Sequence, residues 1–255
     1  MTTLIRIGGL AFAGMLLVTH AGITQSLERR VAAAPNGTVR FTFAARDGVC
    51  GNGRNVNIRS SSRDSDWESD CEHGPVHTAL SVSGGKVTKV ATYVGGRWKQ
   101  GAANVTDLGN VPAKDAAEYL VSIAGQGMSG SNDAVFAATL ADSVEIWPGL
   151  LKLARNESLP RETRRTAIFW MGQAAGSAAT ASLDSIARDN SGNREVREAA
   201  VFAISQRPRD ESVPALIRLA RNDRDPEIRR KAIFWLGQSD DPRALALFED
   251  LLTRR

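Results

Sequence analysis

Two cysteines, Cys50 and Cys71, and two histidines close to them, His73 and His77, are the residues best suited to chemistry in this chain. Two thiols can form a disulfide, or they can bind zinc together with imidazole nitrogens. Structural zinc sites usually contain a Cys-x-x-Cys pair, which this chain lacks. The spacing therefore favours a Cys50–Cys71 disulfide, whose loop of about 20 residues would stabilise the fold by about 3 kcal/mol. A metal site is the alternative; we expect neither a metal nor a cofactor.

Four acidic residues, Asp64, Asp66, Glu68 and Asp70, alternate between the cysteines. This spacing is similar to that of the oxygen ligands in a calcium loop. The pattern fails further on, because serine and proline stand where such a loop needs glycine and glutamate. We expect an ordinary solvated acidic loop.

Sequence motifs for catalysis are missing from the chain. There is no Gly-x-Ser-x-Gly turn, no phosphate-binding glycine loop and no His-Glu-x-x-His zinc motif. No motif assigns a carboxylate as a general acid or base. We therefore expect a protein that is not an enzyme. The alternative is an enzyme whose site lies at the junction of the two parts of the chain, around His73 and the acidic loop.

The first 21 residues predict export. Arg6 precedes an apolar run over residues 7–18, and small residues follow, as in a secretory signal peptide. We expect cleavage near residue 21 or as late as residue 34, which would leave a periplasmic or secreted protein. The alternative is that this segment stays uncleaved and anchors the protein, and in that case alone we expect contact with a membrane. The formal net charge of +4 is modest and both signs are well mixed, so we expect no nucleic-acid partner.

Residues 36–100 predict a small antiparallel β domain. Apolar residues alternate with polar ones at 39–43, short runs follow at 56–58 and 76–82, and a Gly-Gly turn precedes another run at 87–94. Because so small a sheet buries little core alone, a disulfide would be a useful support.

Residues 112–255 contain a repeat. The copies AIFWMGQ, AVFAISQ and AIFWLGQ begin at Ala167, Ala200 and Ala232, which are 33 and then 32 residues apart. A period in this range is typical of a solenoid of helix pairs. Residues 112–143 form a degenerate first repeat. We expect first helices over 182–187, 213–220 and 244–252, and second helices over 161–173, 194–206 and 226–238.

The segment DPEIRRKAIFWLG at residues 225–237 resembles the second helix of a HEAT repeat, of the short bacterial type also found in phycobilisome-lyase-like proteins. The pairing of an N-terminal sheet with such repeats is similar to that of exported bacterial HEAT-repeat proteins. The resemblance implies a right-handed α-solenoid that binds proteins or peptides. It also implies that Arg164, Arg197 and Arg229 are structural, pairing with a turn carboxylate such as Asp223 or Asp225.

The helical period assigns two faces to each second helix. In the last copy, Ile228, Ala232, Trp235 and Leu236 are expected on the core face, while Phe234 points away from it. A phenylalanine recurs at this position in every copy, always with a glutamine four residues later. We expect a ladder of these residues on the concave surface, flanked by cations that would favour an acidic partner. The candidate partner-binding residues are Phe169, Gln173, Phe202, Gln206, Phe234, Gln238, Arg165, Arg230 and Lys231.

Two interpretations of the ladder stay open. Each phenylalanine could pack on the next repeat and only stabilise the stack, or it could be exposed and bind an extended segment of a partner. The expected fold class is α+β, a small disulfide-linked antiparallel β domain followed by the α-solenoid. The expected function is that of an exported, non-enzymatic scaffold that binds a protein or peptide on its concave face. The alternative is a structural component of the cell envelope without a ligand groove.

Overall fold

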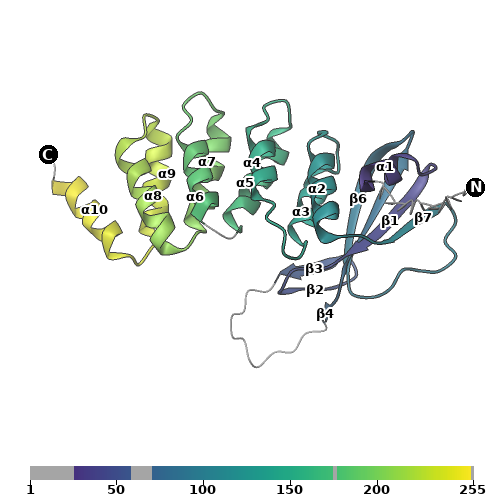
Figure 1. The fold of residues 1–255 in the computed structure, drawn as a ribbon. Coiled ribbons are helices and arrows are strands. Elements are labelled where there is room, and N and C mark those ends of the chain that lie inside the picture. The colour runs from purple at the N-terminus through teal and green to yellow at the C-terminus, as the bar shows by residue number, and fades with distance from the viewer. Residues whose placement is uncertain (1–25, 59–70, 175–176, 254–255) are drawn as a thin grey trace, which may run out of the picture.

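The computed structural model describes residues 26–58, 71–174 and 177–253. In this part of the chain, two small sheets at the N-terminal end are followed by a row of helix pairs (Figure 1). The expected signal peptide and the acidic loop lie outside the described residues. No helix among the described residues is long and apolar enough to span a membrane.

The larger sheet has four strands in the order β6-β5-β1-β7, and the smaller sheet has three in the order β3-β2-β4. The strands expected near residues 39–43, 56–58, 76–82 and 87–94 are all present. The bounds are β1 Gly37–Phe43, β2 Val49–Asn52, β3 Asn55–Ile58, β4 Glu72–His73, β5 Val76–Ser83, β6 Lys86–Val94 and β7 Val105–Asn110.

The larger sheet is mixed, which corrects the expectation of a purely antiparallel β domain. Strand β5 pairs antiparallel with β1 and β6, but β7 pairs parallel with β1. Because β7 follows β6 through the connection at residues 95–104, it crosses to the far edge of the sheet and runs along β1. The sheet thus continues beyond residue 100, where the sequence pattern suggested that it ends.

One face of the larger sheet belongs to the core of the molecule. Its strands alternate between buried and exposed side chains, and Phe41, Leu80 and Val90 are almost fully buried. The short helix α1 (Leu27–Ala32) adds Leu27 and Val31 to the same core and contacts the first helix of the row. Helix α1 therefore belongs structurally to the folded protein.

The disulfide between Cys50 and Cys71 is present, as predicted. Cys50 lies in β2, and the bond ties it to the residue that precedes β4, 21 positions further along the chain. The two sulfur atoms are bonded to each other, so neither cysteine carries a free thiol.

Nine helices of the described chain follow the sheets. They form the pairs α2–α3, α4–α5, α6–α7 and α8–α9, and α10, which contacts α8, is the last helix of the described residues (Figure 1). The pair α2–α3 is the degenerate repeat expected at residues 112–143. The bounds are α2 Ala113–Ala124, α3 Ser131–Thr139, α4 Trp147–Arg155, α5 Arg161–Gly172, α6 Ser177–Ala187, α7 Arg194–Ser205, α8 Arg209–Asn222, α9 Pro226–Gly237 and α10 Pro242–Thr253.

Local chemistry fixes where the second helices begin. Asn193 caps α7 by accepting hydrogen bonds from the backbone N–H groups of Glu195 and Val196. Asp225 caps α9 in the same way, and Pro226 occupies the first helical position. These are the residue types that helix starts prefer.

A single continuous core joins the sheet to the helices. It extends from Leu27 in α1 to Leu247 in α10, so the larger sheet covers the N-terminal end of the stack. Helix α3 packs on β6, and Gly130 allows this approach because a Cβ there would meet the backbone of Val90 at 3.2 Å. The second helices α5, α7 and α9 contact each other more closely than the first helices α4, α6 and α8 do. In a curved stack of helix pairs the closer layer is the inner one, so this spacing favours the second-helix face as the concave one.

Candidate partner-binding groove

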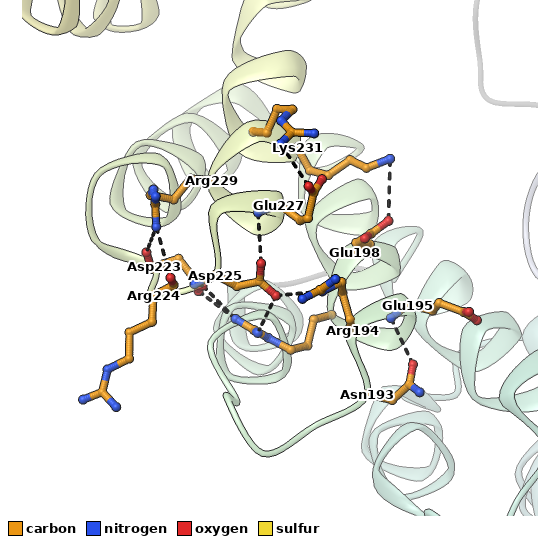
Figure 2. Close-up of polar contacts among 12 residues, drawn as sticks. Asn193, Arg194, Glu195, Glu198, Asp223, Arg224, Asp225, Glu227, Arg229 and Lys231 are labelled. Atoms are coloured by element: carbon orange, nitrogen blue, oxygen red, sulfur yellow. Dashed lines mark hydrogen bonds and ion pairs between the residues drawn. The ribbon is translucent and has the colours of Figure 1, made fainter.

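A buried arginine connects the last two complete repeats. Arg197 of α7 donates two hydrogen bonds to Asp223, at 2.8 and 3.0 Å, and one to the carbonyl oxygen of Ala187 at 2.8 Å. Asp223 lies in the turn between α8 and α9, and only 5% of the Arg197 side chain and 2% of the Asp223 side chain are exposed. Figure 2 shows how this turn and its carboxylates face α7. The arginine is part of the fold, as the resemblance implied.

The other two arginines of this series contact backbone. Arg164 donates to the carbonyl oxygen of Ala154, and Arg229 donates to those of Asp223 and Arg224 (Figure 2). Arg164 has no acidic partner in the described ranges, because asparagine stands at the corresponding turn position, 190. Arg164 and Arg197 therefore share a contact to the end of the preceding helix, whereas Arg229 contacts the turn between α8 and α9. Among the described residues, the carboxylate contact of this series occurs for Arg197.

Asp225 is a second connection between these repeats. It accepts a backbone hydrogen bond from Glu227 and one at 2.9 Å from Arg194 of α7 (Figure 2). The Glu227 N–H, followed by Arg194 and Arg197, lowers the pKa of Asp225 against the opposing effect of burial. The carboxylate thus stays ionised while it caps α9 and contacts α7.

Two phenylalanines of the repeat are covered by tryptophans of the following repeat. Phe136 lies 5.6 Å from Trp170 of the next second helix, and Phe202 lies 5.1 Å from Trp235, measured between ring centroids. The sequence had placed Trp235 on the core face, but it is only partly buried. Its ring packs on Phe202 of the neighbouring repeat, because the ring of Phe202 is an apolar surface within its reach.

Two phenylalanines have no such cover. Helix α7 carries Ala203 where α5 and α9 carry tryptophan, so Phe169 remains 41% exposed. The described residues contain no further second helix beyond α9, and Phe234 is 54% exposed. Phe136 and Phe202 thus pack on the next repeat, as the first interpretation of the ladder has it, while Phe169 and Phe234 face solvent. Binding of a partner by the exposed rings stays a prediction.

The exposed Phe169 lines a groove of about 590 Å³ that runs across α5, α7 and α9. We call it the second-helix groove. Its floor is apolar and its rim carries charges of both signs. The groove is lined by Glu162, Arg165, Thr166, Phe169, Glu195, Glu198, Ala199, Phe202, Lys231 and Trp235.

The rim is more balanced in charge than the sequence suggested. Lys231 lies 3.6 Å from Glu198 (Figure 2). Glu195 is paired with Arg161 at 2.6 Å. Arg165 forms no ion pair within the described part of the chain. Three carboxylates stand beside two cations, so the groove does not simply select an acidic partner.

The structure brings together some of the predicted site residues and separates others. Phe169, Phe202, Arg165 and Lys231 line the groove, whereas the remaining predicted residues do not. The glutamines occupy the C-cap positions of their helices, one turn beyond the groove. Arg230 is turned towards Glu227, at 2.9 Å. The predicted residues outside the groove are Phe234, Gln173, Gln206, Gln238 and Arg230.

The rim carboxylates and the tryptophan cover were not predicted. A signal for the rim exists in the sequence, because Glu162, Arg165, Thr166 and Phe169 are spaced i, i+3, i+4, i+7, on one face of a helix. The same spacing recurs at Glu195 to Phe202. The tryptophan cover leaves no such signal, because it joins residues on different helices.

The histidines near the disulfide lie apart from the groove. The Nδ1 atom of His73 is 3.0 Å from the carbonyl oxygen of Val49, and His77 lies in β5 next to Trp98. Within the described ranges, no three His, Cys, Asp or Glu side chains are grouped closely enough to bind a metal ion.

Comparison with known families agrees with the helical part of this description. Residues 183–255 match the family model for HEAT repeats, which covers α7 to α10 and the C-terminal part of α6. A search of curated proteins finds no match. The C-terminal helix pairs are therefore HEAT repeats, a fold consistent with a protein-binding scaffold.

Proposed function

We propose that the protein is a non-enzymatic scaffold that binds an extended segment of another protein, or a peptide, in the second-helix groove. The exposed ring of Phe169 carries this proposal. An aromatic side chain that is 41% exposed beside the partly covered Phe202 offers apolar contact area that folding has left unused. Aromatic side chains in a groove are typical anchors of protein interfaces.

The rim indicates what kind of segment fits. Lys231 and Glu198 already partly neutralise each other, while Arg165 has no ionic partner among the described residues. A partner segment with an apolar side chain for the floor and a carboxylate near Arg165 would match the groove. A segment with acidic residues alone would meet Glu162 and Glu195, which repel it.

We further propose that the protein acts outside the cytoplasm, in the periplasm or after secretion. The disulfide supports this location, because such bonds persist mainly in oxidising compartments. The N-terminal pattern of residues 1–21 supports it independently. Cleavage near residue 21 would retain α1, whereas cleavage at residue 34 would remove the buried Leu27 and Val31. We therefore favour the earlier position, which N-terminal sequencing of the exported protein tests.

The test of the groove compares Phe169→Ser with Phe234→Ser. Both rings are exposed, so both variants should keep the thermal stability of the parent protein to within about 1 kcal/mol of unfolding free energy. Of these two phenylalanines, Phe169 lines the groove and Phe234 does not. Affinity capture from an envelope extract, followed by mass spectrometry, identifies partners of the parent protein. Titration with the purified partner then compares the two variants.

We expect Phe169→Ser to lose the partner and Phe234→Ser to keep it. If both variants bind the partner as the parent does, the groove is not the binding site. If the parent captures nothing specific, a structural role in the envelope explains the solenoid better than a ligand groove does.

A further inference from the structure

The exposed face of the larger sheet contains a second cleft, far from the helical groove in sequence. Side chains of β1, β5 and β6 that point away from the core form its floor, and the connection at residues 95–104 borders it. Its volume is about 580 Å³, within the range of roughly 300–1,000 Å³ that small-molecule sites occupy. We call it the sheet cleft.

Cations of the sheet cleft greatly outnumber its carboxylates. Arg40, Arg54, Lys89, Arg97 and Lys99 line it, and no Asp or Glu is among its described lining residues. The whole chain contains 32 basic and 28 acidic residues, so this local excess is not a reflection of composition. The cleft therefore has a positive potential that favours an anion.

The nearest carboxylates are already engaged. Asp107 accepts a hydrogen bond from Arg40 at 2.8 Å, and Glu72 accepts one from the backbone N–H of Gly96 at 2.7 Å. Hydrogen bonds from Gly109 and Arg40 outweigh burial and lower the pKa of Asp107, so it stays ionised beside its arginine. The other four cations of the cleft form no ion pair with a described residue.

Aromatic rings hold two of the guanidinium groups in place. Arg40 lies over the ring of Trp98 at 5.2 Å, and Arg54 lies over the ring of Tyr93 at 5.8 Å. A guanidinium on an aromatic face keeps its planar set of N–H donors in one orientation, which suits a carboxylate or phosphate. Because Arg40 already binds Asp107, Arg54 is the oriented donor that remains for a ligand.

The ring side chains of the cleft also contain polar atoms without partners. The Nδ1 atom of His77 and the Nε1 atom of Trp98 are buried and find no hydrogen bond among the described residues. Burial lowers the pKa of His77, which leaves the imidazole neutral near pH 7. Unsatisfied buried polar atoms destabilise a fold, and two of them lie in adjacent rings of this cleft, where a bound ligand could supply their partners.

We propose that the sheet cleft binds a small organic oxyanion. Arg54, Lys89, Arg97 and Lys99 hold its phosphate or carboxylate group, and its apolar part lies against Tyr93, next to the small side chains of the floor. This inference is independent of the peptide groove on the helices. It gives the N-terminal sheets a binding role of their own.

The experiment titrates the full exported chain with phenyl phosphate and with inorganic phosphate in a low-salt buffer, by calorimetry. Phenyl phosphate should bind more tightly, because its ring adds apolar contact to the charge interaction. Binding should weaken as salt is added, because the cations are exposed to solvent. Replacing Trp98 by Phe should remove any change in tryptophan fluorescence on binding while the calorimetric signal remains.

Lys86 and Lys89 provide a matched control, because both lie in β6 but only Lys89 lines the cleft. The variant Arg54→Gln/Lys89→Gln should bind phenyl phosphate about tenfold more weakly. The variant Arg224→Gln/Lys86→Gln removes the same net charge away from the cleft and should bind as the parent does. Thermal unfolding of both variants confirms that they are folded.

Equal affinity of the two double variants, or no binding by the parent, would overturn the proposal. A second experiment measures whether the protein sediments with phosphatidylglycerol vesicles. If the parent protein binds these vesicles through Arg54 and Lys89 but does not respond to phenyl phosphate, the cleft recognises a membrane surface, and the proposal of a small ligand is wrong.

Discussion

Replacing Asp223 by Asn should destabilise the helical array more than any comparable change on its surface. The carboxylate of Asp223 accepts two hydrogen bonds from Arg197, at 2.8 and 3.0 Å, and both side chains are almost fully buried. Removing one charge of a buried pair leaves the other without compensation, which typically costs about 3–5 kcal/mol.

The loss at this site should lie near the lower end of that range. Arg197 retains its hydrogen bond to the carbonyl oxygen of Ala187, and Asp225 lies 3.6 Å from the guanidinium. We therefore expect Asp223→Asn to lower the free energy of unfolding by about 3 kcal/mol. The exposed pair Arg209–Asp240, with 67% and 96% of its side chains exposed, provides the control. Asp240→Asn should cost less than about 0.5 kcal/mol.

Urea unfolding followed by circular dichroism measures both variants. Repeat arrays can unfold in steps, so the slope of the transition should be compared as well as its midpoint. The variant Arg197→Met and the double variant Arg197→Met/Asp223→Asn complete a double-mutant cycle. Because each single change leaves one partner buried and unpaired, the double variant should lose much less than the two singles together.

Two results would refute this reasoning. If Asp223→Asn costs as little as Asp240→Asn, the buried pair contributes no more than an exposed one. If the losses of Arg197→Met and Asp223→Asn simply add in the double variant, the two side chains do not interact energetically, whatever their distance.

Three further predictions concern other parts of the molecule. Phe202→Ala should cost about 2 kcal/mol of unfolding free energy because the ring packs on an indole of α9, whereas the exposed Phe234→Ala should cost less than about 1 kcal/mol in the same urea assay. Replacing Cys50 and Cys71 by Ser should lower stability by about 3 kcal/mol, a loss that a reducing agent should reproduce in the parent protein. Hydrogen bonds from its neighbouring arginine lower the pKa of Asp241 from 3.8 to about 2. Its stabilising contribution should therefore be lost as the pH falls from about 4 towards 2, and urea midpoints across this range should decrease less in Asp241→Asn.

The helical part could be predicted from the sequence because it repeats. The copies at Ala167, Ala200 and Ala232 fix the phase, and the second helices end within one residue of their expected bounds. The repeat gives no information on a position whose residue type differs from that in the other copies. Arg207, in the turn between α7 and α8, is buried and donates a hydrogen bond to Thr180 of α6, but alanine and serine occupy its equivalent positions.

The sheets were less predictable because their signals are local and weak. Strand β7 reads Val-Thr-Asp-Leu-Gly-Asn, which lacks regular alternation, and its parallel partner β1 lies more than sixty residues earlier. Strand β2 contains Gly51, whose missing side chain lets Val94 approach, a contact that no pattern within β2 reveals. The sheet cleft depends on both strand order and the connection at residues 95–104, so it becomes visible only once the fold is known.

A substitution in the middle copy of the repeat explains why the second-helix groove exists. That copy reads AVFAISQ, so Ala203 stands where the other copies have tryptophan. Gly172 of α5 lies directly against Ala203, because a Cβ built on Gly172 would meet the Cβ of Ala203 at 3.1 Å. Helices α5 and α7 are thus too close at this point for a tryptophan, and Phe169 has no ring to cover it. The close contact that stabilises these two repeats and the exposed ring that opens the groove are consequences of the same small residue.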